Sequence, residues 1–180
     1  MAKPPPAAPS TPSQPIPSEP SVTEGVHKVT LHEMADHLGS AAKSLPEIES
    51  IALYRAALVV QTEAKRVIGT YDYGWPRLQP DTIARKGGDT PLLETGEMRD
   101  SIEISVSADG HTASVGSNNP KAVWHELGTV HIPARSFLQG AALRTEQECH
   151  EIVGRTVFAG VMSGSPFGLG VELSDIPRRE

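Results

Sequence analysis

Cysteine is nearly absent from this chain of 180 residues, and the one present is Cys149. A single cysteine closes no intrachain disulfide. No C-x-x-C pair or Cys/His cluster offers the ligand set of a structural zinc site. We therefore expect a protein made in a reducing cytoplasm, without cofactor or metal.

Long apolar runs are also missing. The best stretch, residues 51–60, is interrupted by Arg55 and falls well short of the roughly 20 apolar residues that a membrane-spanning helix needs. Prolines follow Lys3 where a secretion signal would place an apolar segment. We expect neither a membrane span nor a secretion signal.

Positive charge is scarce. Sixteen Lys and Arg stand against 22 Asp and Glu, which gives a net charge of −6. Binding that coats nucleic acid depends on clustered cations that neutralise phosphates, so the composition disfavours it. The length fits one domain with tails.

Proline is present but unevenly placed, since eight of the 16 prolines lie in the first 20 residues. Each proline fixes φ and removes a backbone donor, so residues 1–24 are expected to form an extended arm. Their P-x-x-P spacings leave open a cytoplasmic adaptor that recruits a signalling domain. Residues 25–162 are the expected domain, and the Gly- and Pro-containing residues 163–180 a C-terminal tail.

Three capping-box patterns predict helices. Thr30 with Glu33 predicts a short helix from Leu31 to about Ala42. Ser44 with Glu47 predicts a second, longer helix that ends near Gly69. The box at residues 136–139 predicts a last helix to about Val161, with Cys149 in its apolar stripe.

A β-hairpin is predicted between these helices. Ser101 to Ser107 alternates apolar and polar residues, and the turn Asp109-Gly110 sets Ile104 opposite Val115. Asn119-Pro120 should open a short helix through Trp124 that Gly128 ends, and 130–132 is a possible strand. The fold class is therefore α+β, a small antiparallel sheet on two longer helices, whose open edges are expected to meet neighbouring chains.

Residues 71–97 show no periodicity and are expected to form a long loop, a length that usually serves a function. Arg77, Arg85 and Lys86 give this loop positive charge. Composition favours solvated side chains there over contacts with DNA phosphates.

The segment from His125 to His131 is the strongest chemical candidate. Zincin peptidases use H-E-x-x-H, because histidines at i and i+4 share a helix face and the Glu serves as base. Here Thr129 stands four residues after His125, and His131 lies six residues on, beyond Gly128. We expect ordinary hydrogen bonds for both histidines; a metal-dependent hydrolase using His125, Glu126 and His131 remains the alternative.

Five segments, taken in order, resemble the motif series of phage virion morphogenesis proteins, a family that includes Mu-like tail completion proteins and HK97-like neck and tail terminator proteins. The resemblance covers about Val29 to Val161. The segments are Trp75-Pro76-Arg77-Leu78, Pro91 to Met98 with Ser101-Ile102, Val115-Gly116-Ser117, Ala122 to Thr129, and Ile132 to Leu138.

The resemblance implies a structural protein and not an enzyme. It implies a subunit of a ring, hexameric to match the sixfold tail, at the head-proximal end of a phage tail. Its partners would be a head-completion or connector protein and the major tail tube protein, with genomic DNA passing through unbound. Such a protein would reside in the virion neck, and in the host cytoplasm before assembly. The matched residues would have fold and interface roles: Trp75, Leu93, Gly96, His125, Gly128 and Arg135.

Overall fold

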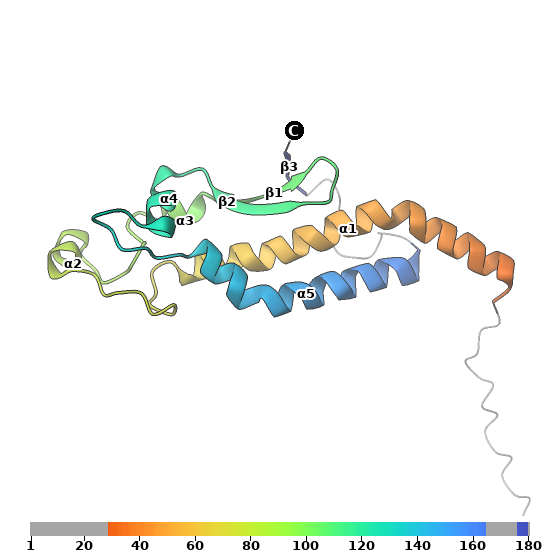
Figure 1. The fold of residues 1–180 in the computed structure, drawn as a ribbon, viewed down its shortest axis with the longest axis horizontal. Coiled ribbons are helices and arrows are strands. Elements are labelled where there is room, and N and C mark those ends of the chain that lie inside the picture. Colours follow the sequence, from red (N-terminus) through yellow and green to blue (C-terminus); the bar gives the residue numbers. More distant parts are fainter. Residues whose placement is uncertain (1–28, 165–175, 180) are drawn as a thin grey trace, which may run out of the picture.

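The computed structural model describes residues 29–164 and 176–179. The predicted arm, residues 1–24, and most of the predicted C-terminal tail lie outside this range. The elements follow in the order α1 Leu31–Val67, α2 Pro80–Lys86, α3 Glu97–Asp100, β1 Ile102–Ser107, β2 Ala113–Ser117, α4 Pro120–Leu127, α5 Leu138–Ser163 and β3 Arg178–Arg179. The α+β class is confirmed, with a hairpin packed against the two long helices (Figure 1).

The first helix is one element, so the expected break near Ala42 is wrong. Thr30 does form its capping box with Glu33, but α1 then runs on to Val67 with Pro46 inside it. Proline removes the donor that would reach the carbonyl of Ala42, and Ala42 is exposed, where water can bind that carbonyl. Buried residues on both sides of Pro46 hold the helix together through packing. Figure 1 shows the N-terminal part of α1 bending away from the rest.

The last helix, α5, packs along α1 (Figure 1). Gly160 permits a close approach, because a Cβ there would lie 2.7 Å from Ile48. Arg55 donates to the hydroxyl of Thr156 at 3.2 Å. Half-buried Cys149 lies 3.6 Å from the carbonyl oxygen of Ala56, in agreement with its predicted packing role.

The hairpin has the predicted register, with Val106 opposite Ala113 and Ile104 opposite Val115. A strand near the end of the sequence was not predicted. Residues 178–179 of β3 pair in parallel with Val106 and Ser107, so the sheet order is β2-β1-β3 and the last two residues of that hairpin edge are covered. A two-residue strand carries no alternation that sequence analysis can detect.

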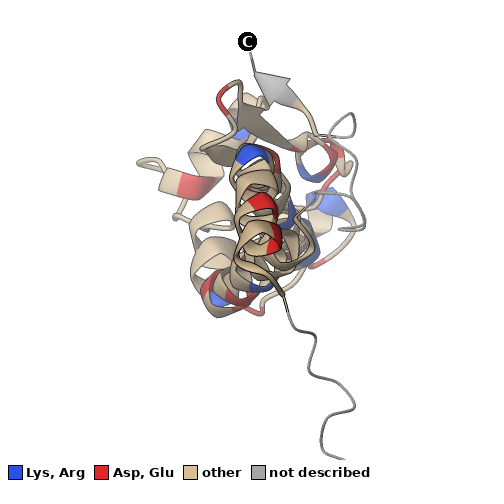
Figure 2. Cartoon of the chain, turned by 90° about the vertical axis from the view of Figure 1, so that its right-hand side faces the viewer, with Lys and Arg blue, Asp and Glu red and all other residues tan. Residues whose placement is uncertain are grey.

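The sheet and α5 lie on different sides of α1 (Figures 1 and 2). One cluster of buried side chains joins the C-terminal half of α1 to α3, β1, α4 and the start of α5, and includes Val67, Ile102 and Phe137. A second cluster joins Ile48, Ile51, Val106 and Ile176. The core therefore runs along α1, and Ile176 ties the end of the chain to it.

Two connecting segments differ from expectation. The stretch 71–97 contains the helix α2, which begins at Pro80 and ends at Gly87 in the left-handed conformation, with φ 71°. Residues 130–132 form no strand. They turn instead, because the backbone N–H of Thr129 donates to the carbonyl of Ile132 at 2.8 Å and the Thr129 hydroxyl accepts the N–H of Ile132 at 3.1 Å.

Among the described residues, no helix combines the length and the apolar character needed to cross a membrane.

Candidate functional site

A tight turn brings His125 and Arg135 together. Gly128 follows α4 with φ 78°, and a Cβ at this position would lie 2.8 Å from the backbone nitrogen of Ala134. The chain therefore folds back on itself only with glycine here. The backbone N–H of Arg135 then donates to the carbonyl of His125 at 2.7 Å.

The side chain of Arg135 joins the segment after α4 to the loop after α1. Its guanidinium donates from Nη2 to the carbonyl oxygen of Pro76 at 3.0 Å. The side chain is buried, with a residue exposure of 6%, and its Nε has no hydrogen-bond partner. No carboxylate of the described residues forms an ion pair with it, so this buried positive charge is matched only by a neutral oxygen.

Trp75 and Leu93 anchor the same region to the core. Both pack against the buried cluster that includes Val67 and Phe137. The Trp75 ring meets that of Tyr73 edge to face, at 5.5 Å between centroids and 75° between planes. These side chains fix the position of the loop on which Pro76 receives Arg135.

Gly96 begins α3 in the left-handed conformation, with φ 85°, and is buried. A side chain there would be strained, and its Cβ would lie 3.3 Å from the Arg99 guanidinium. The turn at Gly96 leads Met98 into the core. The structural roles expected for glycine at 96 and 128 thus fit the backbone found.

A pocket of about 420 Å³ opens between α2, the loop before it and the segment after α4. His125 and His131 line it, as do Leu92 and Ile132. The charged groups on its wall are the four cations Arg77, Arg85, Lys86 and Arg135 and the carboxylate of Glu94. An acidic chain thus gathers an excess of positive charge at one place.

The surroundings of the pocket lower the pKa of His125 and of Lys86. Burial lowers the pKa of His125 below its usual value of 6.5, and the charges of Arg135, Lys86 and Lys121 lower it further. Burial also lowers the pKa of Lys86, with Arg135 and Arg85 acting in the same direction and Glu94 against it. The pocket therefore favours an incoming negative group.

Lys86 and Arg77 are partly engaged inside the chain. The Lys86 Nζ donates to the carbonyl oxygen of Thr90 at 2.6 Å. Arg77 lies 3.0 Å from a carboxylate oxygen of Asp89 and over the ring of Tyr71. Arg85 is exposed and makes no such contact with another described residue, so its guanidinium can reach a partner.

Glu126 performs a structural task that the capping-box prediction missed. Its Oε2 accepts the backbone N–H of Phe137 at 2.8 Å and that of Leu138 at 2.9 Å, and its Oε1 accepts that of Gln139 at 2.9 Å. The predicted cap, Ser136, instead donates its hydroxyl to the Glu126 carbonyl at 2.9 Å. A carboxylate at a helix N-terminus satisfies donors that the helix leaves open.

This geometry bears on the hydrolase alternative. Both carboxylate oxygens of Glu126 are occupied by α5, so Glu126 is not poised as a general base. His125 and His131 line the same pocket, yet within residues 29–164 and 176–179 no group of three or more His, Cys, Asp or Glu side chains is arranged to hold a metal ion.

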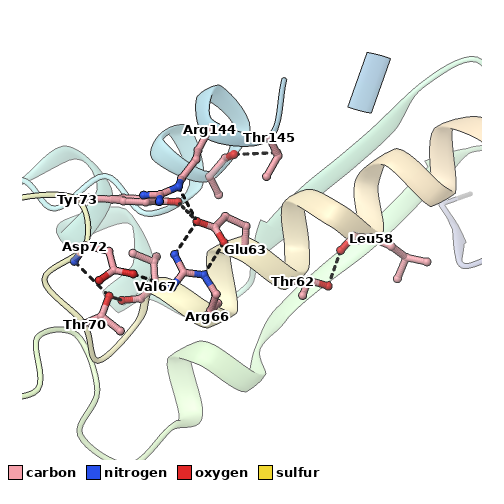
Figure 3. A network of polar contacts seen from close by, with 11 residues as sticks. Leu58, Thr62, Glu63, Arg66, Val67, Thr70, Asp72, Tyr73, Arg144 and Thr145 are labelled. Carbon is pink, nitrogen blue, oxygen red and sulfur yellow. Dashed lines mark hydrogen bonds and ion pairs between the residues drawn. The ribbon is translucent and has the colours of Figure 1, made fainter. Parts of the chain in front are cut away.

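A second polar network lies where α1 meets α5 (Figure 3). The Glu63 carboxylate accepts from Arg66 at 2.6 Å and from the Tyr73 hydroxyl at 3.0 Å, and Arg144 of α5 lies 3.6 Å from it. Arg66 lowers the pKa of Glu63, while burial and the hydrogen bond to Glu63 raise that of Tyr73 to about 12. The network links the loop that carries Trp75 to both long helices.

The structure brings the six predicted residues to one end of the molecule. Glu94 and Pro76 belong to the same place and were not singled out from the sequence. Their roles depend on α2 turning the loop back over α4, and no local pattern encodes this arrangement. The signal that was available is the positive charge of Arg77, Arg85 and Lys86, which are wall residues of the pocket.

Comparison of the chain with protein-family models, with curated proteins and with solved structures finds no match.

Proposed function

We propose that the chain is a structural subunit of a phage neck, which forms a ring as a tail completion, tail terminator or head-tail joining protein. The observation that carries the proposal is the convergence of the six motif residues. Trp75, Leu93 and Gly96 lie about 30 residues or more before His125, Gly128 and Arg135 in sequence. The hydrogen bond from Arg135 to Pro76, next to Trp75, joins the two groups, and Gly96 and His125 line one small pocket.

The roles of these residues support a structural protein over an enzyme. Gly96 and Gly128 provide turns, Trp75 and Leu93 anchor a loop to the core, and Arg135 joins two segments. Glu126, the acid of the alternative hydrolase, caps α5. The residues common to the motif series thus have roles in holding together one end of the molecule.

In this proposal the partners are other copies of the chain in a sixfold ring, a connector or head-completion protein, and the tail tube protein. DNA passes through the ring without sequence-specific contact, and the net charge of −6 opposes its adhesion. The protein is then found in the virion neck, and in the host cytoplasm before assembly.

The experiment that tests the function locates the protein in particles. Particles made by the phage or prophage that encodes the chain are labelled with an antibody raised against it and viewed by electron microscopy. We expect label at the head-tail junction, and unjoined heads and tails when the gene is deleted. Portal, capsid and tail tube genes beside it would add support. Normal joined particles after deletion would refute the proposal.

A further inference from the structure

The two ends of the molecule carry complementary surfaces that are exposed in the part of the chain that the structure describes. The first is the pocket end. Helix α4 exposes the apolar side chains of Val123, Trp124 and Leu127, and the turn after it exposes Val130. Trp124 directly precedes His125 and Val130 directly precedes His131, so these two exposed residues are chain neighbours of the pocket wall. Val123 and Leu127 lie on the side of α4 opposite His125.

The second surface is the N-terminal part of α1. Helix α5 ends at Gly164 beside His37, so the first turns of α1 extend beyond it (Figure 1). An apolar stripe along residues 31–45 is exposed in the described part of the chain. Its members are Leu31, Met34, Leu38 and Leu45.

The charge of this stripe has the opposite sign to that of the pocket. Residues 31–47 contain Glu33, Asp36 and Glu47 against one cation, Lys43. Glu47 is exposed and pairs with no described residue, while Asp36 has a 3.5 Å contact with His32 that is largely open to solvent. An apolar stripe flanked by carboxylates is what an apolar face flanked by cations would bind.

We infer that the N-terminal half of α1, residues 31–47, docks on the pocket end of a second copy of the chain, with a carboxylate entering the cationic pocket. This inference rests on the proposed ring and names its contact. A buried guanidinium without a carboxylate partner is costly, and the docked carboxylate compensates the charge of Arg135. The contact joins two different surfaces, so it repeats from copy to copy and closes into a ring when the rotation permits.

The sheet edges are the other candidate contact. The sequence led us to expect that the hairpin edges meet neighbouring chains. β3 pairs with only the last two residues of β1, Val106 and Ser107, so it narrows this candidate without removing it.

The test uses two full-length variants in which exposed residues are changed. One carries Arg85→Glu in the pocket wall, and the other carries Leu38→Glu in the α1 stripe. Arg155→Glu, on the exposed face of α5, is the matched control for the first. Mass photometry and native mass spectrometry record the assembly state, and thermal unfolding confirms that each variant is folded.

We expect each variant alone to remain monomeric where the unmodified chain and Arg155→Glu assemble. Mixed in equal amounts, the two variants should form dimers and nothing larger, because one intact pocket end and one intact α1 remain between them. Assembly of the unmodified chain should also weaken at high salt.

The outcomes separate this inference from the proposed function. Rings formed by both single variants would overturn the contact and leave the neck proposal standing. If the unmodified chain forms open chains or dimers that both variants disrupt, the contact is supported. If, in addition, no ring forms and no label lies at the neck, the neck proposal is refuted. Loss of assembly on deleting residues 1–28, with Leu38→Glu still assembling, would assign the pocket to the arm and overturn the inference.

Discussion

Gly160 of α5 lies directly against Ile48 of α1, and a Cβ on the glycine would stand 2.7 Å from three carbons of the isoleucine side chain. Ile48 is fully buried, so it has no free space into which to move. The separation of the two long helices is set at this contact.

The variant Gly160→Ala should therefore destabilise the fold by about 1–3 kcal/mol through overpacking. Gly154→Ala is its control on the same helix, since a Cβ there meets nothing within 4 Å. It should be neutral or stabilising, by up to about 1 kcal/mol, because alanine is the better helix former. Urea unfolding measures both, and equal effects would show that the close approach of the helices is not what matters.

The fate of the three capping boxes shows what sequence analysis can decide. The box at Thr30 forms as predicted, because Thr30 and Glu33 satisfy each other's backbone N–H groups through contacts three residues apart. The box at Ser44 lies within a longer apolar pattern, and packing of Ile48 and Ile51 overrides it. At Ser136 the cap is replaced by Glu126, which is ten residues away and reaches α5 only because the turn at Gly128 brings α4 back.

In the candidate site, too, the sequence predicts the local features and misses the long-range contacts. The glycines of the turns and the register of the hairpin depend on local chemistry, so the sequence predicts them. The pocket depends on how α2, the loop at Pro76 and the segment after α4 meet, and the strand β3 depends on a contact between chain segments about 70 residues apart. Such long-range contacts leave no periodic trace in one sequence.

Removing the Glu126 carboxylate, which caps α5, should lower the free energy of unfolding. Glu126→Ala leaves three backbone N–H groups at the start of α5 without their acceptor, and we expect a loss of about 2 kcal/mol. Glu146→Ala, an exposed change on the same helix, should cost less than about 0.5 kcal/mol. Denaturant titration decides, and equal losses would contradict the capping role.

Replacing Gly128 should cost more stability than replacing a left-handed glycine that has open space around it. Gly128→Ala brings a Cβ to 2.8 Å from the Ala134 backbone, so both the backbone strain of about 1–3 kcal/mol and a clash oppose folding. Gly87→Ala, at φ 71° with open space around it, should cost about 1–2 kcal/mol. If calorimetry ranks the two melting temperatures in the opposite order, the close return of the chain is refuted.

The pKa values of two histidines, His125 and His111, should be shifted in opposite directions by the fold. The folded chain holds the pKa of His125 below 6.5, so the unfolded chain binds the proton first and stability falls as the pH drops below about 6.5. The Glu49 carboxylate, 3.1 Å from His111, raises the pKa of His111, so its contribution is full below pH 6.5 and is lost as the pH rises through the folded pKa. NMR titration of the ring signals should show His125 titrating below His111.

The stability measurement for the same pair uses single variants. His125→Gln should flatten the loss of unfolding free energy on the acid side, and His111→Gln should flatten the loss at higher pH. A His125 ring that titrates above that of His111 would contradict the cationic surroundings assigned to it.

Metal removal should change nothing. Because Glu126 is held by α5, incubation with a chelator is expected to leave the melting temperature and the assembly state unaltered, and elemental analysis should find less than one zinc per chain. Stoichiometric zinc that is lost in a double variant of His125 and His131 would revive the hydrolase.

The distance in sequence between the two long helices governs how the chain is made. Arg55 meets Thr156, 101 residues later, so α1 emerges from the ribosome long before the helix that covers it. Its buried face, with Ile48 and Ile51, stays open to other nascent chains while the hairpin and loops are synthesised. The two long helices pack together only once α5, Leu138–Ser163, has emerged, and fast synthesis up to the end of α5 shortens the interval in which aggregation competes.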